Sequence, residues 1–326
     1  MKVFLAGATG AIGRRLVPML VAAGHTVTGT THRPDRMTSI QFAGATPVLV
    51  NALNEKEVVA AVQQSQPEII IHQLTAIPAN LNLRRFDEGF EMTNRLRTEG
   101  TDHLLTAARA VGVRRFIAQS YAGWYARNGS WIKSENDPLM SDGISVGRRT
   151  LDATIHLECA VLQEKAVEAF VLRYGSFYGP ATSLRPGAWF FEAVRQRRVP
   201  IVGGGTGFWS FIHVDEAAAT LSAIHSATPG LYNITDDEPA PVSLWLPFLA
   251  AVLGAKAPRH LPKWFARMAV GEYGVAVMTE LRGASNHKAK ALLSWKLRWP
   301  TWRDGFMEGL EVKVQKAEHD PTRAIA

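Results

Sequence analysis

Three glycines near the amino terminus have the spacing of a phosphate-binding loop. Gly7, Gly10 and Gly13 follow the apolar run Val3–Ala6 directly and open a helical pattern. Glycine permits a tight turn at the first position, close approach of a diphosphate at the second, and close helix–strand packing at the third. Amide N–H groups in the first turn of such a helix bind phosphate. The pattern predicts a dinucleotide loop made of Gly7, Thr9, Gly10, Ala11, Ile12 and Gly13.

The residues after the second predicted strand bear on the choice between the two nicotinamide cofactors. An acidic residue there would hold the adenosine ribose diol and repel a 2′-phosphate. The chain instead has His32 and Arg33, and its first carboxylate in this region is Asp35. Arg33, with His32 or Arg14, can form charge-assisted hydrogen bonds with a 2′-phosphate. We therefore expect NADP(H) rather than NAD(H); the alternative is that these are ordinary surface charges.

The composition argues against several other kinds of chemistry. Cys159 is the only cysteine, which rules out an intramolecular disulfide, and its apolar neighbours predict a buried thiol. No His, Asp and Glu residues have metal-ligand spacing, so no metal is expected. The net charge of +7 comes from scattered arginine pairs rather than one basic element, which argues against nucleic acid as a partner.

The chain also lacks the apolar run of roughly 18 residues that a membrane span needs, and no signal-peptide pattern precedes the first strand. We therefore expect a cytoplasmic protein that acts on a small-molecule substrate, with neither nucleic acid nor membrane as a partner.

The elements that must position the glycine loop alternate between apolar runs and helical periods. Continuous apolar strands separated by helices predict an α/β fold, a Rossmann-type doubly wound parallel sheet covered on both faces. The predicted strands are 3–6, 25–30, 46–50, 68–72, 115–119 and 169–173, and the predicted helices are 12–23, 55–64, 93–111 and 150–165.

The pattern changes after about residue 173. Glycine and proline interrupt short segments, and helices with bulky apolar faces follow at 244–253 and 264–270. This change predicts a smaller carboxy-terminal substrate-binding domain. We assign 1–172 and 206–236 to the dinucleotide-binding domain, and 173–205 and 237–326 to the substrate-binding domain.

Several motifs, taken in order, resemble the extended short-chain dehydrogenase/reductase family, which includes NAD-dependent epimerases and dehydratases. Besides the glycine loop, these are segments 71–76, 100–105, 173–180, 211–215 and 230–234. The resemblance implies a cofactor in the amino-terminal domain, a substrate beneath the carboxy-terminal one, and, by analogy, a homodimer. It also implies cofactor contacts at the strand ends, from Asn51, Ala52, Leu53, Leu74, Thr75, Ala76, Gln119, Tyr174 and Ser176.

The chain departs from this family at the catalytic pair. Family members have a Tyr, then a Lys four residues later and a Glu four residues after that. Matching Glu158 to the Glu puts Thr150 and Thr154 where the Tyr and the Lys should stand. The Tyr transfers a proton, while the Lys lowers its pKa and holds the nicotinamide ribose. A threonine hydroxyl is too weak an acid and carries no charge. Arg97 also replaces a usual Asn of the family's helix motif.

A second departure follows the fifth predicted strand. A gapless match puts Tyr121 at the family's catalytic serine, with Ser120 just before it. We expect Tyr121 and Ser120 to be catalytic, with Tyr121 as a replacement proton donor; the alternative is that Tyr121 only contacts the substrate. His156 and His213 are expected to be structural. The segments that line the family's cleft are rich in aromatic residues here, which favours an apolar substrate over a nucleotide sugar. The aromatic residues expected to contact the substrate are Trp124, Tyr125, Tyr178, Trp189 and Trp209.

These residues leave three hypotheses about function. The first is an NAD(P)H-dependent oxidoreductase of a small, rather apolar carbonyl or enone substrate. Such a reaction needs hydride delivery and polarisation of a carbonyl, which Tyr121 and Ser120 can supply. The second is a non-redox isomerase, cyclase or epimerase on the same fold. The third is a non-catalytic NADP-binding sensor. We favour the first, although the fold by itself does not decide among them.

Overall fold

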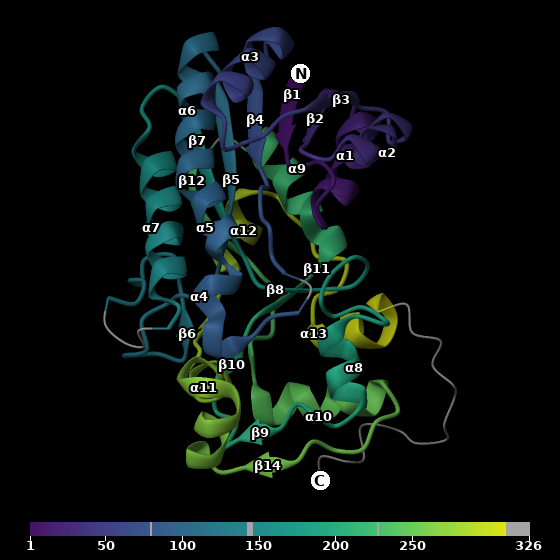
Figure 1. Cartoon of the computed structure of the whole chain (residues 1–326), viewed down its shortest axis with the longest axis vertical. Helices are drawn as coiled ribbons and strands as arrows, with labels where there is room; N and C mark the ends of the chain where they lie inside the picture. The colour runs from purple at the N-terminus through teal and green to yellow at the C-terminus, as the bar shows by residue number, and fades with distance from the viewer. Residues whose placement is uncertain (79, 142–145, 227, 311–326) are drawn as a thin grey trace.

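A parallel seven-stranded sheet organises the amino-terminal part of the chain (Figure 1). The structure is a computed structural model and describes residues 1–78, 80–141, 146–226 and 228–310. The strand order is β12-β7-β5-β4-β1-β2-β3, and every neighbouring pair is parallel. The Rossmann-type prediction is therefore confirmed. The strands are β1 (Lys2–Ala6), β2 (Thr26–Thr31), β3 (Thr46–Leu49), β4 (Ile69–His72), β5 (Arg115–Tyr121), β7 (Glu168–Tyr174) and β12 (Gly230–Ile234).

Helices cover both faces of this sheet because its strands are apolar on both sides. Ile69 and Ile71 pack into one core with α1 and α9, while Ile70 packs into a second core with α3, α6 and α7. Figure 1 shows these two helix layers on opposite sides of the strands. The helices are α1 (Gly13–Ala22), α2 (Met37–Phe42), α3 (Glu55–Ser65), α6 (Glu99–Val111), α7 (Arg148–Gln163) and α9 (Ala218–His225).

The single long helix expected over 93–111 is two helices, α5 (Glu91–Arg97) and α6. They meet at Thr98, whose backbone is not helical (φ −94°, ψ −84°). The Thr98 hydroxyl bonds the carbonyl oxygen of Asn94 at 3.1 Å, which is the kind of side-chain-to-backbone bond that bends helices. The break lets α5 pack along α7, so that Asn94 and Arg97 both reach α7.

A third core lies in the carboxy-terminal part and contains large aromatic side chains such as Trp245, Trp302 and Phe306. Ala289, Leu293 and Trp295 lie outside it and pack into the core that α1 and α9 form on the sheet. Residues 311–326 lie outside the described residues. The helices of this part are α8 (Trp189–Arg195), α10 (Val242–Val252), α11 (Lys263–Thr279), α12 (His287–Leu292) and α13 (Trp302–Asp304).

The remaining elements are short. Several pair in two-stranded sheets that join distant segments, such as β8 with β11 and β6 with β15. Their bounds are α4 (Phe86–Gly89), β6 (Ile132–Lys133), β8 (Ser176–Tyr178), β9 (Ile201–Val202), β10 (Phe208–Trp209), β11 (Phe211–His213), β13 (Ala240–Pro241), β14 (His260–Leu261) and β15 (Gly283–Ala284).

The exposure of Cys159 and the apolar character of the helices also bear on predictions from the sequence. The buried position expected for Cys159 is wrong: this residue is exposed on the outer side of α7, whose inner side carries Leu157 and Val161. In the described part of the chain, none of the helices combines the length and the apolar character needed to cross a bilayer.

Candidate functional site

The glycine loop has the geometry that its spacing predicts. Gly7 has φ +95°, and a Cβ there would lie 2.9 Å from the carbonyl oxygen of Gln73. A Cβ on Gly13 would overlap the carbonyl oxygen of Gly7, so α1 can approach β1 only without a side chain there. A Cβ on Gly10 would meet nothing closer than 3.4 Å. The protein itself therefore does not require a glycine at position 10, and that face of the loop is open to a ligand.

The amino terminus of α1 suits an anion. Its N-cap, Ile12, provides no side-chain cap, and no acidic residue lies in the first turn. Among the described residues, the amides of Ala11 and Ile12 donate to no backbone acceptor. These unpaired donors and the helix dipole favour a bound diphosphate. Arg14 bonds the carbonyl oxygen of Thr9 at 2.9 Å, which holds the loop against the helix.

Positive charge exceeds negative charge at the end of β2. Arg33 makes a bidentate ion pair with Asp35, at 3.1 and 2.8 Å, and both side chains are exposed. Arg36 lies 3.6 Å from the same carboxylate. Burial, with a smaller contribution from the charge of Arg36, lowers the pKa of Arg14, so Arg14 belongs to the same group. Arg33 and Arg36 thus share one carboxylate, and the charge of Arg14 lies near that of Arg36. His32 is exposed beside them.

Most of the other predicted cofactor residues lie where parallel strands end. Leu53 donates to the side chain of Asn51 at 3.1 Å, and His103 lies 3.0 Å from the carbonyl oxygen of Ala52. The amide of Ala76 donates to Thr93, which fixes the segment after β4. Leu74, which is half-buried, and Thr75, which is exposed, follow β4. Gln119 is half-buried near the end of β5, and Ser176 is the first residue of β8, two residues after β7 ends. All four therefore lie near the carboxyl ends of parallel strands.

Tyr174 requires a correction. Its side chain is 1% exposed and packs in the core, and its hydroxyl lies 2.5 Å from that of Thr220. Only its backbone is available to a cofactor. Gln73, which was not among the predicted site residues, is 4% exposed, and neither polar atom of its side chain has a partner among the described residues. Buried amides without partners are uncommon in proteins, so Gln73 is a candidate ligand contact beside Gly7.

The two threonines at the family's catalytic positions are tied into the structure. Thr150 donates its hydroxyl proton to Asp87 (2.8 Å) and accepts from the amide of Asn94 (3.2 Å). Thr154 donates to the carbonyl oxygen of Thr150 (2.8 Å) and accepts from Arg97 (3.1 Å). Both hydroxyls are therefore used in joining α7 to α4 and α5.

Ser120 also requires a correction, because the structure does not offer it to a substrate. It is 2% exposed, and its hydroxyl donates to the carboxylate of Glu158 at 2.5 Å. Arg173 binds the same carboxylate through two nitrogens, at 2.8 and 2.5 Å. Successive side chains of a strand point to opposite faces, so Ser120 and Tyr121 face different layers. Ser120 thus forms part of a buried ion-pair network.

Tyr121 is the last residue of β5, and its ring lies over Gly123 in the turn that follows the strand. A Cβ on Gly123 would overlap this ring, so glycine at that position allows the conformation. Its hydroxyl lies 3.4 Å from that of Ser176. Burial raises the pKa of Tyr121, while the Ser176 hydroxyl and the charge of Arg97 oppose that rise.

Tyr121 belongs to an aromatic cluster made of Phe86, Phe90, Tyr121, Trp124 and Tyr273. The Tyr273 and Phe86 ring centroids are 4.1 Å apart, and Trp124 lies 6.1 Å from Tyr273. The indole nitrogen of Trp124 is buried without a partner among the described residues. The cluster joins three elements that are distant in sequence: α4, the end of β5 and α11; Leu151 of α7 packs on it. A non-helical residue, Gly271 (φ +78°), interrupts α11 just before Tyr273.

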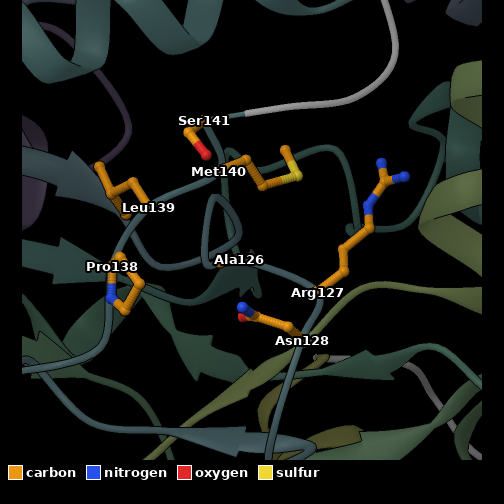
Figure 2. A pocket seen from close by; sticks show the side chains of 7 residues that line it. All are labelled: Ala126, Arg127, Asn128, Pro138, Leu139, Met140 and Ser141. Atoms are coloured by element: carbon orange, nitrogen blue, oxygen red, sulfur yellow. The ribbon is translucent and has the colours of Figure 1, made fainter.

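A pocket of about 340 Å³ adjoins this cluster (Figure 2). Leu139 and Met140 line the pocket and also pack on the aromatic cluster. Its two walls pair through backbone bonds, since Ala126 donates to Pro138. The volume suits a small molecule. The lining residues are Ala126, Arg127, Asn128, Pro138, Leu139, Met140 and Ser141.

Two of the other aromatic predictions require correction. Tyr125 is 2% exposed and donates to Asn233 at 2.6 Å, and Tyr178 is fully buried in the carboxy-terminal core, so neither offers a surface to a substrate. Trp209 is half-buried, packs at a tilt of 46° against Trp245 and donates to the carbonyl oxygen of Val277 at 2.8 Å. Trp189 is exposed at the start of α8.

His213 and His156 both make contacts that hold other parts of the structure. His213 is buried, and its ring lies 3.0 Å from the carbonyl oxygen of Gly309. His156 is exposed and pairs with Asp102 at 2.8 Å, on the outside of α7. In the part of the chain that the structure describes, no three His, Cys, Asp or Glu residues form a group that could hold a metal ion.

Comparisons with known proteins agree with this geometry. Residues 3–235 match the model of the NAD dependent epimerase/dehydratase family. The chain is 41% identical over 310 residues to a 3-diazoavenalumate denitrifying reductase from a Streptomyces species, covering 94% of this chain and 99% of that one. It is 25% identical over 262 residues to a Stigmatella aurantiaca ketoreductase of a farnesylated dihydroquinoline oxide, covering 79% and 75% of the two chains.

The fold is similar to that of a solved human epimerase family protein with NADPH, with a TM-score of 0.74, 20% identity, and coverage of 95% of this chain and 99% of that chain. For a UDP-glucose 4-epimerase from Thermotoga maritima, the TM-score is 0.73 at 20% identity, with 95% and 98% coverage.

The chain therefore belongs to the NAD dependent epimerase/dehydratase family. It is an enzyme of the NAD(P)-dependent oxidoreductase class.

Proposed function

We propose that this chain is an NADPH-dependent reductase that removes nitrogen from a small, flat diazo compound. One observation carries the proposal: Thr150 and Thr154 stand at the positions of the proton-transferring pair, and both hydroxyls are bonded inward. A ketone that accepts a hydride becomes an alkoxide and needs a proton. A diazonium carbon that accepts a hydride forms a C–H bond as its C–N bond breaks, and the C–N electron pair leaves with N₂. No proton donor is required.

Two further observations support this reaction. The relative at 41% identity is a denitrifying reductase and matches over nearly its whole length. The aromatic cluster makes the surroundings of Tyr121 apolar, and the adjoining pocket has the size of a small-molecule site.

The glycine loop fits NADPH, because its open face, free amides and neighbouring guanidinium groups suit a diphosphate and a 2′-phosphate. When bound, this cofactor supplies the hydride. The chain's own residues then exclude water and orient the acceptor. Phe86 and Trp124 keep the site apolar, and the alignment of donor and acceptor supplies the rate enhancement.

The test compares a diazo acceptor with carbonyl acceptors. The protein is mixed with NADPH and, separately, an aryl diazonium salt, the matching aryl ketone and the matching enone, while NADPH absorbance and N₂ are followed. We expect oxidation of one NADPH per N₂ with the diazonium salt, and transfer of deuterium from labelled NADPH to the ring. Turnover of the ketone or enone alone would overturn the proposal.

Reduction of a carbonyl or enone is the second candidate, because Tyr121 offers a phenol beside Ser176 and the Stigmatella relative is a ketoreductase. Tyr121→Phe separates the two. We expect this variant to retain diazo reduction within about threefold, since that reaction needs no acid, whereas general-acid catalysis of ketone reduction would fall by about 100-fold. Loss of both activities would show that Tyr121 has another role.

A further inference from the structure

Arg97 is a buried cation that no carboxylate binds directly. The residue is 6% exposed, and among the described residues its guanidinium makes one hydrogen bond, from Nη1 to the neutral hydroxyl of Thr154 (3.1 Å). Burial lowers the pKa of Arg97 to about 10, which leaves it charged at neutral pH. An unpaired buried charge is costly, so its presence calls for a partner.

The nearby carboxylates do not provide that partner. Both oxygens of Glu158 are taken by Arg173, and one of them also by Ser120. The carboxylate of Asp87 accepts two amides at the start of α7 and the Thr150 hydroxyl. Glu158 is paired with Arg173, and neither Glu158 nor Asp87 makes an ion pair with Arg97 among the described residues.

The surroundings of Arg97 are aromatic and contain further unused polar atoms. Its charge acts on the hydroxyls of both Tyr121 and Tyr273. One helical turn before it, Asn94 must donate its amide to Thr150, because the Thr150 proton is committed to Asp87. The side-chain oxygen of Asn94 is left buried without a partner among the described residues, as is the indole nitrogen of Trp124. Unused donors and acceptors beside flat rings are typical of a ligand site.

We propose that Arg97 binds a carboxylate group of the substrate, while the flat body of that substrate packs against the half-buried ring of Tyr121. This inference rests on the proposed function only in requiring a small-molecule substrate at the end of β5. It identifies the substrate class as aromatic or conjugated carboxylic acids. Arg97 is then the residue that selects acids over their neutral analogues.

The test measures binding, so it does not depend on the reaction. The probes are cinnamate and cinnamamide, which differ only in charge and hydrogen bonding at one end. Their affinities for the NADPH-loaded protein are measured by calorimetry and by quenching of tryptophan fluorescence. We expect the native protein to bind cinnamate more tightly than cinnamamide.

In Arg97→Gln we expect cinnamate affinity to fall by about 10- to 100-fold, the usual value of a charged hydrogen bond, and cinnamamide affinity to change by less than about threefold. Arg95→Gln is the matched control. Arg95 lies on the same helix, is exposed and pairs with Glu99, so its loss should change neither probe. Thermal unfolding of each variant checks the fold.

Thr154→Asp provides a second variant, because it places a carboxylate beside Arg97 and should also abolish the preference for cinnamate. Three results would overturn the proposal: no binding of either probe to the native protein, equal losses for both probes in Arg97→Gln, or an equal loss of NADPH affinity, which would assign Arg97 to the cofactor. If the preference for the acid holds but no diazo compound is reduced, only the proposed reaction fails.

Discussion

At the scale of single residues, Arg33 is the side chain that we expect to distinguish the two cofactors. In the structure it is exposed and paired with Asp35, so it can exchange a carboxylate for a 2′-phosphate without desolvating a buried charge. Arg14 and Arg36 add positive charge at the same place. When Arg33 is removed, the carboxylate of Asp35 keeps only its longer ion pair with Arg36, and it would then repel the phosphate more strongly.

We therefore predict that Arg33→Ala raises the Kd for NADPH by about tenfold or more, the value of a charged hydrogen bond, and changes the Kd for NADH by less than about threefold. Calorimetry with both cofactors measures the difference. Arg195→Ala, which removes an exposed arginine paired with Glu192 on α8, is the control. Equal losses for NADPH and NADH would refute the assignment.

At the scale of secondary-structure elements, the capping of the α7 amino terminus matters because α7 carries both Thr150 and Thr154. Its first amides are capped by a side chain from a distant element rather than by a local residue. Asp87 of α4 is 8% exposed and accepts from the amides of Gly147 and Thr150. A carboxylate at a helix amino terminus is also favoured by the helix dipole.

We predict that Asp87→Ala lowers the free energy of unfolding by at least about 2 kcal/mol, since a buried cap and three hydrogen bonds are lost together. Urea unfolding provides the measurement. Asp152→Ala removes an exposed carboxylate on the same helix, paired with Arg148, and should cost less than about 0.5 kcal/mol. A cost for Asp87→Ala as small as this control would show that Asp87 does not cap α7.

At the scale of the whole molecule, His72 makes the stability of the folded protein depend on pH. It is 1% exposed at the end of β4; its Nδ1 accepts from the amide of Leu74 (3.2 Å), and its Nε2 lies 3.0 Å from the hydroxyl of Thr101. Thr101 donates its own proton to the carbonyl oxygen of Arg97, so Nε2 must carry the ring proton. The ring is therefore neutral, and burial, together with the charge of Arg97, lowers its pKa to about 4.

This lowered pKa predicts a loss of stability in acid. The unfolded chain binds a proton at His72 below about pH 6.5 and the folded chain only below about pH 4, so stability falls as the pH drops between these values. The full effect is about 3 kcal/mol. In His72→Gln this part of the pH dependence should disappear, which unfolding at pH 4.5 and 7 would reveal. His156→Gln, at an exposed position, should behave like the native protein. An unchanged pH slope in His72→Gln would contradict the assignment.

Much of the fold and the cofactor loop could be predicted from the sequence, because both depend on local patterns. Runs such as Ile69–His72 are apolar on both faces, which requires a parallel sheet between two helix layers. The roles of Gly7 and Gly13 follow from backbone sterics that need no knowledge of distant residues. The resemblance to the family, with Glu158 matched to its helical Glu, also implied the substitutions at Thr150 and Thr154.

Only the tertiary structure decided what surrounds those substitutions, because the relevant contacts join distant parts of the chain. Asp87 and Arg97 lie more than 50 residues before the threonines that they bind, and Tyr273 comes from α11. The alternation of side chains along a strand could have separated Ser120 from Tyr121 in advance. The burial of Tyr125 and Tyr178 could not have been foreseen, because aromatic side chains serve a core and a binding site equally well.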